Sequence, residues 1–264
     1  MVSLLALALA QEWSAAEHSD VPAWYRALGL IGPWLAIAVL GILVARSLWH
    51  GQRYRAGSVM GRAEQERVHA AIRAAERRTV GEVVPVVVER SDPHAGAEWL
   101  AALCFILAGS AVLLPYLPWS MPLEFLLMQL AIGALGFALA RALPAFKRLF
   151  VVESRATAAA NEQAFQEFYA NGLHRTQGAT GVLIFVSLLE RRVVVMADEG
   201  IASRVAPEAW KDVDELALAG IRRGSLAEGL ESAVTRAGEL LAQHCPWGAG
   251  DRNELPDRLI VRRQ

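Results

Sequence analysis

The sequence TGVLIFVSLLERRVVVMADEG, residues 180–200, decides the fold, because it holds two runs of branched apolar residues on either side of a short charged segment. The first run covers residues 182–187 and the second covers residues 193–197. Runs of this length and composition are typical of buried strands, and a connection this short joins antiparallel neighbours. The stretch therefore predicts a β-hairpin inside a larger sheet.

A helix and a further strand precede this hairpin. Residues 62–79 carry their apolar side chains on one helical stripe, as in an amphipathic helix that lies on a sheet. The segment GEVVPVVVER follows, and its valines at residues 83–88 predict a strand that is buried on both faces. Pro85 has no backbone donor, so it favours an edge position or a bulge for this strand.

The segment directly before the hairpin predicts another helix. We expect its inner face to carry Ala160, Ala164, Phe165 and Phe168, which repeat at helical spacing. Gly172 follows in NGLHRT, and glycine at that place favours the end of a helix.

Two more helices follow the hairpin. Pro207 suits the first turn of one helix, and Ser225 with Glu228 matches the Ser-x-x-Glu capping box at the start of the other. The single helix and strand that come first could not bury their apolar faces alone, so we expect the polar parts of the chain to form one three-layer α/β domain.

Three apolar stretches precede or interrupt this domain. Residues 28–45 and 99–117 carry no charge, and the second reaches about 28 Å as a helix, close to the thickness of the hydrocarbon layer. Residues 121–143 can form a third span with Glu124 at the interface. The predicted plan is a short non-cytoplasmic segment (1–26), a first transmembrane helix (27–49), the first part of the domain (62–90), a transmembrane helical hairpin (98–143) and the second part of the domain (147–264).

Charge distribution predicts the orientation. Basic residues cluster after the first and third spans, which places those segments and the α/β domain on the cytoplasmic side. Residues 141–150 mix phenylalanine with arginine and lysine, so they suit either contact with anionic membrane lipids or a simple positive-inside anchor. The balance of 26 basic against 27 acidic residues excludes a typical nucleic-acid-binding protein.

The N-terminus and the cysteines leave alternatives open. MVSLLALALA, residues 1–10, is similar to a short signal peptide without a positive first region, and Met60 is a second candidate start. Cys104 and Cys245 lie far apart and fit neither a disulfide framework nor a metal-ligand spacing, so we interpret both as small hydrophobic residues.

Three phrases resemble the TPM-domain family, in particular its bacterial membrane members: AAERRTVGEVVPVVV, GLHRTQGATGVLIFVSLLERRVVVMADEGI and GDRNELPDRLIV. The resemblance implies an α/β/α sandwich in the bacterial inner membrane. Relatives have been linked to acid-phosphatase-like activity, divalent-cation binding, photosystem repair and modulation of membrane receptors. The glycine-rich turn that the family pattern has after its third strand reads ADEGI here, which is a departure.

One sheet edge carries the candidate site residues. The hairpin strands run antiparallel, so Asp198 and Glu199 at its exit lie at the same edge as His174 and Arg175 at its entry. Asp198 and Glu199, with His174, can hold a divalent cation, Asp198 and His174 can act as general acid and base, and Arg175 can bind a phosphate. The alternative is structural: Asp198 caps a turn, Arg175 pairs with it, and His174 is a surface residue.

Two other acidic stretches are weaker candidates. Asp92 would lie at the opposite edge if the strands at residues 83–88 and 182–187 are parallel, as the usual crossover requires. GDRNELPDRL lacks the spacing of an EF-hand loop, so we expect Leu255, Pro256 and Leu259 to dock the tail while its charges face water.

These observations favour an interaction or assistance module for other membrane proteins. The chain has none of the motifs GxxxxGK[ST], HExxH, GxSxG or paired CxxC. The alternative is a weak phosphatase that depends on a divalent metal and uses the Asp198 edge.

Overall fold

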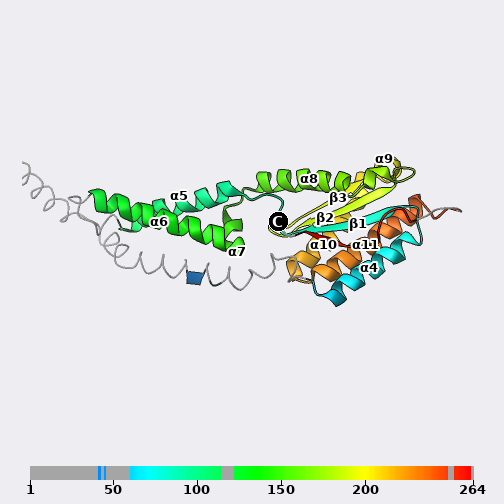
Figure 1. The fold of residues 1–264 in the computed structure, drawn as a ribbon, viewed down its shortest axis with the longest axis horizontal. Helices are drawn as coiled ribbons and strands as arrows, with labels where there is room; N and C mark the ends of the chain where they lie inside the picture. The colour runs from blue at the N-terminus through cyan, green and yellow to red at the C-terminus, as the bar shows by residue number, and fades with distance from the viewer. Residues whose placement is uncertain (1–40, 43–44, 46–59, 114–121, 249–252, 263–264) are drawn as a thin grey trace, which may run out of the picture.

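The computed structural model describes residues 41–42, 45, 60–113, 122–248 and 253–262. It shows a mixed α/β body at one end of an elongated molecule and a helical hairpin, α5 (Ala95–Leu113) and α6 (Pro122–Ala142), at the other (Figure 1). The predicted segments 1–26 and 27–49 lie outside the described residues except for Gly41, Ile42 and Ala45, and most of the turn between the hairpin helices lies outside them too.

The body is built on a four-stranded sheet in the order β3-β2-β1-β4. β2 and β3 pair antiparallel, which confirms the predicted hairpin, and β1 runs parallel to both of its neighbours. The register places Glu82 opposite Gly181 and Ser187 opposite Val88. The strands are β1 (Glu82–Val88), β2 (Gly181–Ser187), β3 (Arg192–Ala197) and β4 (Ile260–Arg262).

Alternation along the two central strands produces two cores. Val83 and Val87 point to the face that three helices cover, whereas Val84, Val86 and Val88 point to the face under a single long helix. All residues of β1 and β2 are buried, as the valine-rich sequence predicted. The three helices are α4 (Arg62–Glu76), α10 (Lys211–Arg223) and α11 (Leu226–His244), and the single helix is α8 (Glu153–Ala170).

Short elements connect these parts. Gly172 adopts φ 76° just after α8, so it ends the helix as predicted. Pro207 opens a 3-10 turn that leads into α10. The remaining elements are α7 (Pro144–Lys147), η3 (Arg148–Phe150), η4 (Leu173–Arg175), α9 (Glu199–Ala202) and η5 (Pro207–Trp210).

The edge position predicted from Pro85 is wrong, because β1 is a central strand. Glu82 donates its amide to Thr180 next to β2, so the amides of odd-numbered residues in β1 point away from β2. On that side β4 pairs only with Val86–Val88, and the amide of Val83 is bonded by the side chain of Glu76. Pro85 therefore falls in a gap between two partners, where no backbone donor is needed.

Three local expectations also need correction. Phe165 is 54% exposed and stacks on Tyr169, because it lies on the outer side of α8. Ser225 occupies the N-cap of α11, but its side chain forms no capping hydrogen bond. The tail residues after Leu259 form β4, a strand that their sequence did not predict, since three residues are too few for a periodic signal.

The hairpin helices pack closely against each other. Gln129 donates to Ser110 at 2.9 Å, and Gly133 and Gly136 of α6 let the backbones approach side chains of α5. Among the described residues, Leu123–Ala142 is long and apolar enough to cross a membrane, and Ala95–Ala111 is a shorter apolar helix.

Candidate functional site

The site residues predicted from the sequence lie at the end of the sheet that is farther from the α5–α6 helical hairpin (Figure 1). Asp198 is the N-cap of α9, and its Oδ1 accepts from the Glu199 amide at 2.8 Å. His174 and Arg175 lie in η4, exposed, and the His174 ring packs on Tyr169 with ring centroids 4.8 Å apart. Capping by Asp198 matches the structural alternative, whereas no ion pair joins Arg175 to Asp198.

A metal at this edge stays a prediction. In the part of the chain that the structure describes, no group of three or more His, Cys, Asp or Glu side chains is placed to hold a metal ion. Asp198 and Glu199 are neighbours in the chain, but Glu199 is exposed and Asp198 is engaged in the cap.

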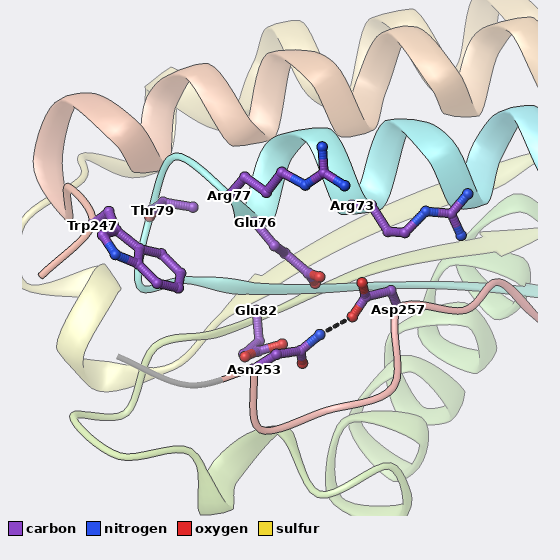
Figure 2. Close-up of a pocket in the computed structure, with 8 residues that line it drawn as sticks. All are labelled: Arg73, Glu76, Arg77, Thr79, Glu82, Trp247, Asn253 and Asp257. Carbon is purple, nitrogen blue, oxygen red and sulfur yellow. Dashed lines mark hydrogen bonds between the residues drawn. The ribbon is translucent and has the colours of Figure 1, made fainter. Parts of the chain in front are cut away.

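A different acidic group lies at the same end of the sheet and borders a cleft of about 220 Å³. Figure 2 shows the carboxyl groups of Glu76 and Asp257 turned toward each other, with Glu82 below them. Glu76 comes from the last turn of α4, Glu82 opens β1, and Asp257 comes from the C-terminal tail. We call this the acidic cleft, and its lining residues are Arg73, Glu76, Arg77, Thr79, Glu82, Trp247, Asn253 and Asp257.

Backbone amides hold one oxygen of each buried glutamate in the acidic cleft. The Val83 amide donates to Glu76 Oε1 at 3.0 Å, and the Glu254 amide donates to Glu82 Oε1 at 2.9 Å. The other oxygen, Oε2, of both Glu76 and Glu82 is buried and accepts no hydrogen bond. Each carboxyl group is thus half satisfied, which is costly for a charged form.

The missing hydrogen bonds and the burial favour the protonated forms of Glu76 and Glu82. Burial raises the pKa of Glu76 to about 9, and the nearby carboxyl groups of Glu82 and Asp257 add to the shift. Burial also raises the pKa of Glu82 above its ordinary value. Glu76 therefore carries a proton at neutral pH.

The C-terminal tail forms one wall of the acidic cleft. Glu254 binds the Gln177 amide through Oε2 at 2.8 Å, and Arg262 pairs with Glu167 of α8 at 2.7 Å. Leu259 is buried and Leu255 packs against the α8 core, so these two residues dock the tail as predicted, whereas the prediction for Pro256 is wrong because Pro256 is exposed. The charges of the tail do not all face water, because Asp257 turns into the acidic cleft and Arg262 pairs with Glu167.

The opposite end of the sheet carries a buried polar group where the chain leaves β1 for the hairpin. His94 Nε2 lies 2.6 Å from Glu190 Oε1, which also accepts from the Ser91 amide at 3.0 Å. Ser187 donates to the other oxygen of Glu190. The side chain of Glu190 is fully buried and that of His94 is 3% exposed. We call His94, Glu190, Ser187 and the Ser91 amide the junction network.

Further ionic contacts extend the junction network toward the hairpin. Asp92 accepts from the His94 amide at 2.5 Å and pairs with Arg155 of α8 at 2.6 Å. Lys147 is buried, donates to the Pro93 carbonyl, and pairs with Glu98 of α5 at 2.9 Å. Hydrogen bonds and ion pairs from residues 91–98 therefore join the sheet to α5, α7 and α8.

Hydrogen bonds keep Glu190 charged. Burial by itself would raise the pKa of Glu190, but the hydrogen bonds from His94, Ser187 and the Ser91 amide outweigh it, so its pKa lies below the ordinary value. The order of the groups also limits the chemistry. A nucleophilic triad needs the histidine between serine and carboxylate, whereas here the carboxylate of Glu190 lies between Ser187 and His94.

Comparisons with known proteins show a likeness in fold. No family model and no curated protein match the chain. The chain is similar to the solution structure of the BA42 protein from the psychrophilic bacterium Bizionia argentinensis, with 18% identity over 77% of this chain and 95% of that chain and a TM-score of 0.49. A likeness of this size carries no argument about function.

Sequence reasoning missed both buried groups. Glu76, Glu82 and Asp257 come from the two separate parts of the domain, and no local pattern joins them. One signal was present, because Glu82 directly precedes a buried valine run and Glu190 follows two buried leucines. A charged residue at a position that must be buried needs bonded partners.

Proposed function

We propose that this chain is a membrane-anchored TPM-like protein of the bacterial inner membrane, and that it acts as an interaction or assistance module for other membrane proteins. The sheet faces the cytoplasm and the α5–α6 hairpin spans the bilayer beside an N-terminal span at residues 27–49. The resemblance of three sequence phrases to TPM domains supports the assignment to that family.

The junction network is the observation that carries this proposal. Six residues separate the end of β1 from the start of α5, and the groups within them are bonded to the sheet through Glu190 and to α7 through Lys147. A mobile tether would leave these groups in water. A buried and bonded junction instead fixes the direction of the sheet relative to the hairpin, which is useful for a domain that must meet neighbours in the same membrane.

The surface of the hairpin supports the membrane assignment. Its outward side chains include Trp99, Leu107 and Leu123, each more than 60% exposed. An apolar surface of this extent requires lipid or protein cover. At 1.5 Å per residue, the 20 residues Leu123–Ala142 of α6 reach about 30 Å, which matches the hydrocarbon layer, and the apolar part of α5, Ala95–Ala111, is shorter.

The phosphatase alternative depends on the distal edge. It requires the oxygens of Asp198 for a metal or a proton, but Asp198 Oδ1 already accepts from the Glu199 amide in the cap of α9. This contact supports a structural role for Asp198 and leaves interaction as the better proposal.

Crosslinking in native membranes tests the proposed function. We expect the full chain, carrying a photoreactive residue on α8 or α10, to capture the same membrane proteins repeatedly. The variant Lys147→Met should capture them less well, because it removes the ion pair with Glu98 while the sheet remains folded. The matched control is Arg141→Met, because Arg141 lies 3.7 Å from Glu98 and its own side chain is 71% exposed.

Two results would contradict the proposal. Capture of nothing except other copies of the chain would indicate a homo-oligomeric role. A reporter fused after Gln264 that is active on the periplasmic side would reverse the predicted orientation.

A further inference from the structure

The acidic cleft contains two buried oxygens that no described group satisfies. Glu76 is 9% exposed and Glu82 is 6% exposed, and Oε2 of each accepts no hydrogen bond. Both side chains line the cleft, and Asp257 adds a third carboxyl group at its open side (Figure 2). Three ionised carboxyl groups in one small cleft repel one another unless one of them is protonated or positive charge is added.

The two arginines that border the acidic cleft do not supply this charge. Arg73 pairs with Glu66 on the outer side of α4 at 3.0 Å. Arg77 forms no ion pair within the described part of the chain, and Figure 2 shows its guanidinium group turned away from the carboxyl groups. The other polar lining groups are engaged, because Thr79 bonds the Cys245 carbonyl and Asn253 bonds Asp257.

The geometry favours an organic cation over a metal ion. A hard cation such as calcium needs six or more oxygens at about 2.3–2.6 Å, and within the described residues no three carboxylates or histidines are close enough to each other to hold a metal. A guanidinium or ammonium group is larger and reaches carboxyl groups that are farther apart. A cleft of about 220 Å³ is smaller than typical ligand pockets and suits one side-chain-sized group.

We propose that the acidic cleft binds a guanidinium or ammonium group, which comes from a free small amine or from an arginine or lysine side chain of another protein. Glu82 and Glu76 contact the bound cation at the closed end of the cleft, and Asp257 contacts it from the C-terminal tail. Trp247, which is 50% exposed at the rim, covers the aliphatic part or the cation by contact with its ring. This site does not depend on the function proposed above.

Binding at this site is linked to protons. Glu76 faces Glu82 of β1, Asp257 of the tail, and Arg73 and Arg77 of its own helix. Burial keeps Glu76 protonated at neutral pH, and the entering cation replaces this proton. We therefore expect affinity to increase with pH and one proton to be released on binding.

Calorimetric titration of the full chain in detergent micelles tests the site. The probe is n-butylguanidinium, and the neutral control of the same shape is n-butylurea. We expect only the cation to bind, more tightly at about pH 8 than at about pH 6. Glu82→Gln should weaken binding at least about tenfold, because a charged hydrogen-bond partner is lost while the acceptor for the Glu254 amide remains.

Two further variants keep the test decisive. Asp257→Asn changes a tail residue outside the core and should also weaken binding, even if Glu82→Gln fails to fold. Arg77→Gln should make binding of the cation tighter, because it removes a neighbouring positive charge. A tripeptide with a central arginine and blocked ends distinguishes the sources: tighter binding than n-butylguanidinium indicates a protein side chain, and weaker binding indicates a free amine.

Three results would overturn the proposal. Equal binding of n-butylurea would show that charge is not recognised. Weaker binding in Arg77→Gln, together with binding of acetate or phosphate, would show an anion site. Binding of calcium without binding of n-butylguanidinium would show a metal site.

Discussion

The two ends of the sheet bury carboxyl groups in opposite ways. At the hairpin end, Glu190 receives hydrogen bonds from His94, Ser187 and the Ser91 amide. At the distal end, Glu76 and Glu82 each leave one buried oxygen without a partner. The pKa of Glu190 is accordingly lowered, whereas the pKa values of Glu76 and Glu82 are raised. Burial is similar at both ends, so the number of donors decides the charge.

This difference separates an architectural group from a binding group. A carboxylate whose hydrogen-bond donors all lie inside the fold has no free acceptor position for a ligand, and it contributes to rigidity. A carboxyl group that lacks partners remains protonated or takes an outside cation. The junction network therefore holds the α5–α6 hairpin to the sheet, whereas the acidic cleft at the opposite end of the sheet keeps unpaired oxygens for the cation proposed above.

The largest expected effect is at the junction network. Glu190→Ala leaves His94 and the Ser91 amide buried without their acceptor, so the free energy of unfolding should fall by about 3 kcal/mol or more. Urea unfolding in detergent measures this loss. Arg155→Ala is the control, since its pair with Asp92 is exposed and should contribute less than about 1 kcal/mol. Equal effects of the two substitutions would contradict the comparison.

The stability of the protein should fall as pH rises, because Glu76 in the acidic cleft has a raised pKa, whereas the lowered pKa of Glu190 acts in the opposite direction. The pKa of Glu76 is raised from 4.5 to about 9, so its contribution to stability is complete below about pH 4.5 and is lost as pH rises toward 9. Glu76→Gln keeps an acceptor for the Val83 amide and removes this loss. We expect the variant to be more stable than the wild type at about pH 8, by on the order of 2 kcal/mol, and not at about pH 5.

A stability profile between about pH 5 and about pH 9 measures the effect of Glu76→Gln. Glu215→Gln on the exposed side of α10 is the control, because it lies outside the acidic cleft and should leave the slope unchanged. Parallel pH profiles of the wild type and Glu76→Gln would show that Glu76 is ionised in the folded protein.

The contact between α5 and α6 should not tolerate a larger side chain at Gly136. A Cβ on Gly136 would lie 2.7 Å from the Phe105 side chain and 3.0 Å from the Ala101 carbonyl oxygen, so Gly136→Ala should destabilise the hairpin by about 2 kcal/mol. Gly96→Ala, where nothing lies within 4 Å, should be neutral or slightly stabilising. Thermal unfolding of both variants in the same detergent checks this contrast.

The smallest expected effect concerns the distal edge. Asp198→Ala removes the cap of α9 and should lower stability by about 1 kcal/mol. Asp198→Asn keeps an oxygen for the cap and should cost less. A generic phosphoester assay on both variants tests the phosphatase alternative at the same time. Hydrolysis by the wild type that Asp198→Asn abolishes would favour the enzyme.

Local patterns predicted most of the strands and helices. The apolar runs of β2 and β3 are separated by a short charged segment, and this spacing is enough to predict their pairing. The central place of β1 could not be predicted, because it depends on β4, which comes from the last residues of the chain. The sequence-predicted group of His174, Arg175, Asp198 and Glu199 does lie at one end of the sheet, but its contacts there are a cap and a ring packing.

By itself, the sequence determined the strand hairpin, the amphipathic helices and the apolar hairpin, because each depends on the spacing of residues that are close in the chain. Tertiary structure alone decided which buried carboxyl groups are charged. Glu190 meets His94 only after the apolar hairpin returns the chain to the sheet, and Glu76 meets Asp257 only when the tail docks. The pKa of a buried group depends on donors that surround it in space, and sequence spacing does not contain that information.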